Sequence, residues 1–146
     1  MVRIIDGDTI HVRDITGETH RIRLAMIDAP EREQLFGTEA TKKLSELLRQ
    51  GTIRLKVKCI DKYNREVAFV YCEGKDVSAE MLKEGMALHY HINFDKCEMY
   101  DKFEAAAKRC HKGLWSQEKI EKPWDFRRKH KAQEQLKLLA IELNSK

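Results

Sequence analysis

The stretch IIDGDTIHV, at residues 4–12, decides the fold because it sets two aspartates within a segment that otherwise has the composition of a β-strand. Ile, Val and Thr favour strands, whereas Asp is depleted in them. Asp8 shares its parity with Ile10 and Val12, so the pattern places its carboxylate on the face that these side chains bury. Asp-Gly is also a strong turn signal. This segment alone therefore leaves two explanations open, a tight turn or a carboxylate wanted at the mouth of a sheet for a metal ion.

Hydrophobic periodicity divides the rest of the chain into strands followed or interrupted by helices. Alternating apolar residues predict strands at 2–5, 8–13, 20–27, 52–60 and 66–71. Helical spacing predicts helices at 38–50, 77–84, 98–112 and 132–143, with Thr38 as the first N-cap and Pro123 as a break before the last helix. We expect Ile53, Leu55, Val57 and Cys59 to face inward. This order indicates an α+β protein, mainly β, built on a small five-stranded Greek-key barrel that binds ligands on its open face.

The gross composition indicates one globular domain and excludes some function classes. The chain has 146 residues, 42% hydrophobic and 36% charged, and no apolar run approaches the roughly 18 residues of a membrane span. The net charge is +4, but residues 121–146 contain seven Lys/Arg and four Asp/Glu, so the remainder carries only +1. Overall charge is thus weak support for a nucleic-acid partner. The basic run RRKHK, at 127–131, is expected to be a solvated face, with phosphate contact as the alternative.

Cysteine and histidine spacing gives no standard metal pattern. For Cys97 and Cys110, a disulfide in an oxidising compartment and two unpaired thiols are both open alternatives. A rival zinc site would have to gather residues from the segment after 88, namely His89, His91, Cys97, Cys110 and His111. No recognised zinc spacing fits them. We expect His111 instead to lie at the end of the third helix, where a cation meets the negative end of the helix dipole.

Charged residues gather where predicted strands begin and end. Asp8 begins one strand and Asp28 ends a neighbouring one, so two carboxylates would meet at the mouth of the barrel and repel unless a cation lies between them. Ca²⁺ and Mg²⁺ prefer such oxygen ligands. Arg23 and Arg65 lie near strand ends, and guanidinium groups match phosphate oxygens in pairs. Glu31 follows Asp28 across a proline and is a candidate general base for water. Together these residues predict phosphodiester hydrolysis.

At these residues the sequence closely resembles the staphylococcal nuclease (thermonuclease) family. The resemblance covers roughly residues 2–116 and rests on several motifs in the right order: IIDGDTI (4–10), RLAMIDAPE (23–31), DKYNREVAFVY (61–71), LKEGMALHY (82–90) and AAAKRCHKGLW (105–115). It implies an OB-fold barrel with three helices at 1–116, followed by an extension at 117–146 with an amphipathic tail helix. It also implies calcium-dependent hydrolysis of DNA and RNA to 3′-phosphate products.

The resemblance assigns a role to each motif residue. Asp8, Asp28 and the backbone carbonyl of Ala29 would bind Ca²⁺, and Asp6 would support the metal site from behind. Ala29 replaces a threonine of the best-known member, so any role of that hydroxyl is lost while the carbonyl remains. Arg23 and Arg65 would hold the scissile phosphate and stabilise its charge. Glu31 would orient or deprotonate the attacking water.

Two tyrosines are expected to contact the nucleotide. Tyr63 falls on a family position that lines the nucleotide pocket. The family's second tyrosine aligns ambiguously with Tyr90 or His91, and Tyr90 could equally pack on the barrel. Base stacking on an aromatic ring contributes about 1–3 kcal/mol. The expected substrates are therefore DNA and RNA that are single-stranded or locally open.

Two other functions stay open beside the nuclease. One is a non-catalytic binding module of the same fold, as in the repeated domains of Tudor-staphylococcal nuclease proteins, and the other is a plain OB-fold single-strand binder. The presence of all five charged positions favours the enzyme. We expect a monomer, although the tail helix could dock on the barrel, bind a partner or form a dimer. No signal peptide is visible, but the resemblance favours a secreted or periplasmic location.

Overall fold

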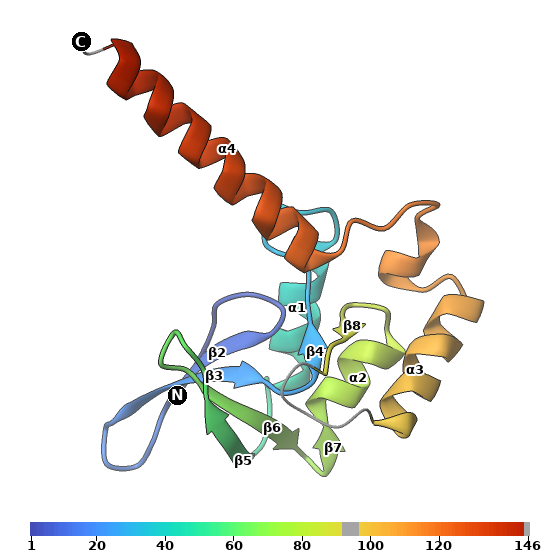
Figure 1. Ribbon diagram of the computed structural model, residues 1–146. Coiled ribbons are helices and arrows are strands. Elements are labelled where there is room, and N and C mark those ends of the chain that lie inside the picture. Colours follow the sequence, from blue (N-terminus) through green and yellow to red (C-terminus); the bar gives the residue numbers. More distant parts are fainter. Residues whose placement is uncertain (92–96, 145–146) are drawn as a thin grey trace.

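The computed structural model describes residues 1–91 and 97–144, which fold into a curved sheet flanked by helices (Figure 1). Within these residues the strands are β1 Val2–Ile4, β2 Thr9–Arg13, β3 Thr19–Leu24, β4 Ile27–Asp28, β5 Ile53–Ile60, β6 Glu66–Cys72, β7 Lys75–Asp76 and β8 Leu88–His89. The helices are α1 Gly37–Leu47, α2 Val77–Lys83, α3 Glu98–Arg109 and α4 Pro123–Asn144, with a 3-10 turn, η1, at Gly113–Ser116. The predicted α+β class is confirmed.

The main sheet has the strand order β1-β2-β3-β6-β5, and β7 adds to β6. All neighbours are antiparallel except β3 and β6, which run parallel with Arg23 opposite Val67. The long crossover through α1 and β5 joins these two strands. The five main strands correspond to the five predicted from alternation, and their order is consistent with an OB-fold. Closure of the sheet into a barrel stays a prediction.

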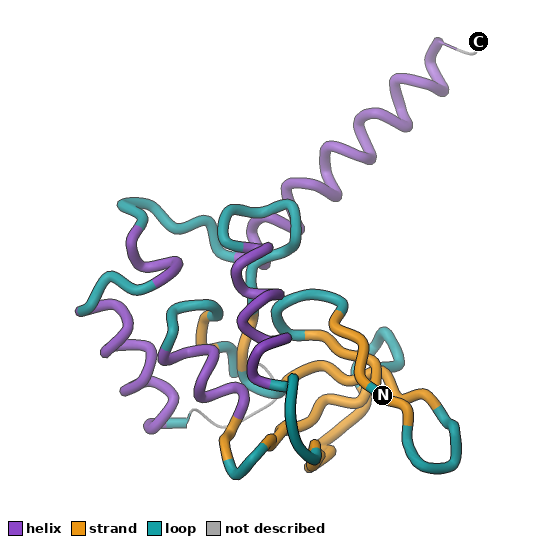
Figure 2. Tube along the Cα trace, turned by 180° about the vertical axis from the view of Figure 1, so that it is seen from behind, coloured by secondary structure: helices purple, strands orange, loops and turns teal. Residues whose placement is uncertain are grey.

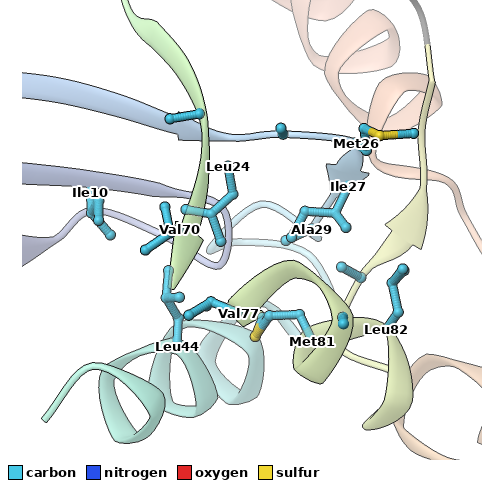
Figure 3. Close-up of a cluster of buried hydrophobic side chains, with 14 of the residues drawn as sticks. Ile10, Leu24, Met26, Ile27, Ala29, Leu44, Val70, Val77, Met81 and Leu82 are labelled. Atoms are coloured by element: carbon cyan, nitrogen blue, oxygen red, sulfur yellow. The ribbon is translucent and has the colours of Figure 1, made fainter. Parts of the chain in front are cut away.

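The core lies between the sheet and helices α1 and α2. Ile10, Leu24 and Val70 project from three strands toward Leu44 of α1 and Met81 of α2, and Figure 3 shows them meeting in one cluster. Helices α1, α2 and α3 lie together to one side of the strands when the molecule is seen from behind, whereas α4 extends away from them (Figure 2). Burying these side chains, at roughly 25 cal/mol per Å² of apolar surface, stabilises the scaffold that carries the strand ends.

The strand predicted at 20–27 is interrupted, and this break places Asp28. β3 ends at Leu24, and Met26 adopts a left-handed backbone conformation with φ of 65°. The chain then enters β4, which pairs with β8 in a separate two-stranded sheet. Alternation could not reveal the break, because Met26 is buried as its parity predicts and is not a typical turn residue.

Two helix starts differ from the sequence expectation. The N-cap of α1 is Phe36, in a left-handed conformation, and Thr38 lies inside the helix. Pro123 does not separate the last helix from the body but begins α4, nine residues before the expected start at 132. Proline is well suited to a first helical turn, where its missing N–H would have no partner.

The edge strand β5 is also less buried than expected. Ile53 and Leu55 are partly buried, but Val57 and Cys59 are exposed, so the inward placement of the last two was wrong. The register shifts between Val57 and Cys59, which marks a bulge in β5, and a bulge bends the strand that contains it. All four cysteines are free, so Cys97 and Cys110 are not bridged.

Within the described residues, no helix combines the length and hydrophobicity needed to cross a bilayer.

Candidate functional site

The Asp8 carboxylate lies just before β2, buried, and joins two distant motifs. Its Oδ2 accepts a hydrogen bond of 2.8 Å from the backbone N–H of Ala29, and its Oδ1 accepts one of 3.0 Å from the Thr9 hydroxyl. Burial raises the pKa of this carboxyl, but Arg23 and the hydrogen bonds from Ala29 and Thr9 outweigh burial, and the net pKa lies below its ordinary value. Asp8 is therefore held as an anion next to Asp28.

The glycine between the two aspartates is required by space. A Cβ atom at Gly7 would lie 2.7 Å from the Cβ of Ala29 and 2.8 Å from the Cβ of Ala40. The DGD segment does reverse the chain tightly between β1 and β2, as the turn interpretation expected, with the Ile5 N–H donating to the Thr9 carbonyl. Gly7 is not among the residues with positive φ, so the close approach of the DGD segment to β4 and α1 explains the glycine.

Arg23 brings the two predicted metal-binding carboxylates together. Its Nη2 lies 3.4 Å from Asp8 Oδ2 and 3.3 Å from Asp28 Oδ1. Its Nη1 donates hydrogen bonds of 2.8 Å to the carbonyls of Leu24 and Ile27, on the two sides of the strand break. The Arg23 guanidinium therefore lies in the break between β3 and β4. The two carbonyls of the break hold it so that its Nη2 faces both aspartates.

Asp28 is fully buried and has a second arginine partner that the sequence analysis did not identify. Arg127 of α4 donates from Nη2 to Oδ2 at 2.9 Å and from Nη1 to Oδ1 at 3.1 Å. Burial raises the pKa of the Asp28 carboxyl, and although the two arginines oppose this, the pKa remains above its ordinary value. The Arg127 contact contradicts, for this one residue, the expectation that the run at 127–131 is only a solvated face.

Glu31 reaches the same place from the loop after β4. Its Oε1 accepts a hydrogen bond of 2.9 Å from Arg127 Nη1, so Glu31 and Asp28 share one guanidinium. Its backbone N–H donates to Oε1 of Gln34, a buried side chain whose amide nitrogen donates to the Glu121 carbonyl. Gln34 thus ties the Glu31 loop to the connection that leads into α4.

Arg65 reaches the site indirectly. Its Nε pairs with Asp61 Oδ2 at 2.8 Å, and its Nη1 lies 3.4 Å from the Thr9 hydroxyl that itself donates to Asp8. The guanidinium carbon lies 5.2 Å from the ring centre of Tyr63, which is 59% exposed. Arg65 and Tyr63 therefore lie together at the edge of the site, and the Thr9 hydroxyl lies between Arg65 and Asp8.

Tyr90 is partly buried and packs against α4. Its backbone N–H donates to the Met26 carbonyl, and its ring centre is 5.4 Å from that of Trp124 in α4. His91, the alternative in the alignment, is exposed and lies 5.3 Å from the ring of His89.

Asp6 holds the backbone of Asp8 through a hydrogen bond. Its Oδ1 accepts a hydrogen bond of 3.1 Å from the backbone N–H of Asp8. Burial and the neighbouring Asp8 carboxylate raise the pKa of Asp6 to about 7. The two aspartates of the DGD motif thus have different environments, with the more ionised one nearer the arginines.

The donor set fits a hard divalent cation. Two carboxylates that share one guanidinium nitrogen need positive charge between them, and carboxylate and carbonyl oxygens are the ligands Ca²⁺ prefers. Asp8 and Asp28 would supply the side-chain oxygens. The Ala29 N–H is used by Asp8, and binding through the Ala29 carbonyl stays a prediction.

Two other clusters do not resemble this site. Asp14, Glu18 and His20 form the one group, in the part of the chain described, of three or more side-chain donors lying within 4.8 Å of one another. Both His20 nitrogens are already paired, at 3.0 Å with Asp14 and 2.8 Å with Glu66, so ion pairing explains that cluster without a metal. The rival zinc site is not assembled among residues 1–91 and 97–144. His111 instead has a φ of 52° and ends α3, consistent with its predicted place at the helix terminus.

Comparison with known proteins finds relatives that cover most of this chain. The family model described as "Staphylococcal nuclease homologue" matches residues 21–117. The chain is 37% identical over 142 residues to a protein of Shigella flexneri named "Micrococcal nuclease", covering 90% of this chain and 80% of that one. It is also 37% identical over 132 residues to an "Uncharacterized endonuclease" of Haemophilus influenzae, covering 90% and 73%.

Longer relatives contain the same region as one part. A protein of Arabidopsis thaliana named "Staphylococcal-like nuclease CAN1" is 36% identical over 115 residues, which is 79% of this chain but 35% of the relative. An uncharacterised 38.1 kDa protein of Capnoides sempervirens is 36% identical over 126 residues, which is 86% of this chain and 36% of that protein. The chain thus spans about a third of these relatives and most of the bacterial ones. The protein belongs to the staphylococcal nuclease family.

Proposed function

We propose that the protein is a calcium-dependent nuclease that hydrolyses phosphodiester bonds of DNA and RNA without selecting the sugar and leaves 3′-phosphate ends. The names of the bacterial relatives support a nuclease. The observation that carries the proposal is the convergence of Asp8 and Asp28 on a single nitrogen of Arg23, with Glu31 joined to Asp28 through Arg127.

The carboxylates account for cation dependence. Asp8 and Asp28 would hold Ca²⁺ together with the Ala29 carbonyl, and Asp6 would fix the backbone of Asp8. When bound, Ca²⁺ supplies positive charge to a phosphate oxygen. The buried position of both aspartates keeps water from competing for their oxygens.

Arginines and Glu31 account for the chemistry. Arg23 contacts Oδ2 of Asp8, and Arg65 reaches Oδ1 through the Thr9 hydroxyl. Both arginines would bind the remaining phosphate oxygens, whose negative charge grows as water attacks. Glu31 would take the proton of that water. The new P–O bond would form as the bond from phosphorus to the 5′ oxygen breaks. The leaving oxygen takes up a proton from solvent water, which gives a 3′-phosphate and a 5′-hydroxyl. Removing one such charge-stabilising donor typically lowers the rate about 10²-fold or more.

Substrate contacts would be unselective. Tyr63 is exposed at the rim beside Arg65 and offers a ring on which any base can stack. Tyr90 would offer a second ring. Stacking and phosphate contacts read no base edge and favour strands that are single or locally open.

The experiment that tests the proposal follows digestion of a single-stranded DNA and an RNA of the same sequence in Ca²⁺ and in EGTA. We expect digestion of both only in Ca²⁺, with ends that a phosphatase trims at the 3′ side. Glu31→Gln and Arg65→Ala should each lower turnover at least about 10²-fold. The matched controls Glu33→Gln and Arg54→Ala change exposed residues and should retain the wild-type rate.

Binding without digestion in either buffer would support a non-catalytic module or a plain single-strand binder instead. Digestion unaffected by EGTA would exclude the calcium requirement. Near-normal turnover of both Glu31→Gln and Arg65→Ala would remove the assigned roles.

A further inference from the structure

The guanidinium of Arg127 occupies the space between the carboxylates assigned to the cation and to the attacking water. It contacts both oxygens of Asp28 and one oxygen of Glu31, at 2.9–3.1 Å. Such two-point, charge-assisted contacts are among the strongest that side chains form. The Arg127 side chain is still 43% exposed, so it enters the site from the solvent side.

The same helix turn covers the predicted base-stacking residue. Trp124 packs on Tyr90, with ring centres 5.4 Å apart and planes inclined at 36°. Trp124 and Arg127 are three residues apart and therefore share one face of α4. One helix turn thus places the Trp124 ring on Tyr90, where a base is expected to stack, and the Arg127 guanidinium on Asp28, where the metal is expected to bind.

This turn is attached at few points. Pro123 is buried and Trp124 and Phe126 are partly buried, but residues 127–144 are exposed, and Figure 1 shows α4 extending away from the body. Gln34 anchors the segment just before the helix through the Glu121 carbonyl. Release of the first turn would therefore break the Arg127 and Trp124 contacts without disturbing the core described above.

Cation binding and Arg127 docking use the same atoms. A divalent ion on Asp28 needs an oxygen that Arg127 now holds, and two cations side by side repel. Glu31 cannot accept a proton from water through the oxygen that Arg127 occupies without exchanging that partner.

From these contacts we infer that the first turn of α4 is an internal, displaceable occupant of the nuclease site: Trp124 and Arg127 hold the site closed, and the cation and nucleic acid must release them. This inference rests on the proposed function, because it takes Asp28, Glu31 and Tyr90 as the cation, water and base positions. In such a protein the apparent Kd for the ligand equals the Kd of the open form divided by the fraction of molecules that are open.

The test compares Ca²⁺ affinity, by titration calorimetry, among the wild type, Arg127→Ala, Trp124→Ala and the matched control Arg128→Ala. Arg128 is 80% exposed, and its ion pair with Asp125 has a distance of 4.0 Å. If nine-tenths of the wild type is closed, Arg127→Ala should bind Ca²⁺ about tenfold more tightly, and Arg128→Ala should match the wild type. Trp124→Ala should also bind more tightly, although it removes no charge, which separates release of the helix from simple electrostatics.

A second measurement follows the helix without any cation. In EGTA, the emission of Trp124, obtained as the difference from Trp124→Phe, should shift to longer wavelength in Arg127→Ala and not in Arg128→Ala. Adding Ca²⁺ to the wild type should produce the same shift.

The inference is overturned if Arg127→Ala binds Ca²⁺ equally or less tightly, or if Trp124 emission ignores both Ca²⁺ and the loss of Arg127. In that case Arg127 stays in place and orients the carboxylates. Failure of the proposed function has a different signature: no form digests nucleic acid in Ca²⁺, whatever the affinities and emission spectra show.

Discussion

The Oδ2 atom of Asp8 lies 2.8 Å from the backbone nitrogen of Ala29, and this hydrogen bond joins the segments that carry the first two motifs of the family. Because Asp28 precedes Ala29, the bond also sets the separation of the two aspartates that share Arg23. The site therefore depends on how closely residues 6–8 approach β4 and α1.

Gly7→Ala should disturb this approach. The added methyl would lie 2.7–2.8 Å from the Cβ atoms of Ala29 and Ala40, so one segment must shift. We expect a loss of about 1–3 kcal/mol in the free energy of unfolding and a fall of about 10²-fold in turnover, since small displacements of catalytic groups are costly. Urea unfolding and an oligonucleotide cleavage assay check this. Wild-type values for both would show that the close packing at Gly7 is not needed.

His20 should make stability fall as pH rises. Its hydrogen bonds to Glu66 and Asp14 raise its pKa from 6.5 to about 9, so its contribution is complete below about pH 6.5 and is lost as pH rises through about 9. The difference in urea midpoint between the wild type and His20→Gln should thus be largest near pH 6 and shrink by pH 10. A difference that is constant over this range would contradict the ion-pair account.

Leu44→Ala should destabilise the fold without involving the site. Leu44 is fully buried between α1 and the sheet, and such truncations cost about 2–5 kcal/mol. Leu139→Ala changes an exposed leucine of α4 and should alter the free energy of unfolding by no more than about 0.5 kcal/mol. Thermal unfolding distinguishes the two. Equal losses would mean that the α4 leucines are covered in solution.

Much of the fold was predictable because the sheet buries one face. The alternation in residues 52–60 and 66–71 predicted strands β5 and β6, which pair antiparallel with Ile53 opposite Cys72. The break at Met26 was not predictable, since a residue with that parity and hydrophobicity belongs in a strand unless tertiary contacts impose positive φ. The early start of α4 was not predictable from the apolar spacing at 132–143, because a proline is compatible both with a break before a helix and with the first helical turn, where Pro123 lies.

The site was predictable as far as the motifs reach. Asp8, Arg23 and Asp28 meet as expected, and Arg65 arrives through Thr9. Arg127 was missed because its partners lie 96 and 99 residues away, and a basic run gives no signal of which member turns inward. The division into 1–116 and 117–146 stays a prediction.

The most direct test of the cation site is the Ca²⁺ concentration that half-saturates cleavage, measured for the wild type, Asp28→Asn and the exposed-residue control Glu33→Gln. Asp28→Asn keeps the shape of the side chain but removes its negative charge, which is proposed to bind the cation together with Asp8. We predict a Ca²⁺ requirement raised by at least about tenfold in Asp28→Asn, with Glu33→Gln unchanged. Equal Ca²⁺ requirements in all three proteins would contradict a calcium site formed by Asp8 and Asp28.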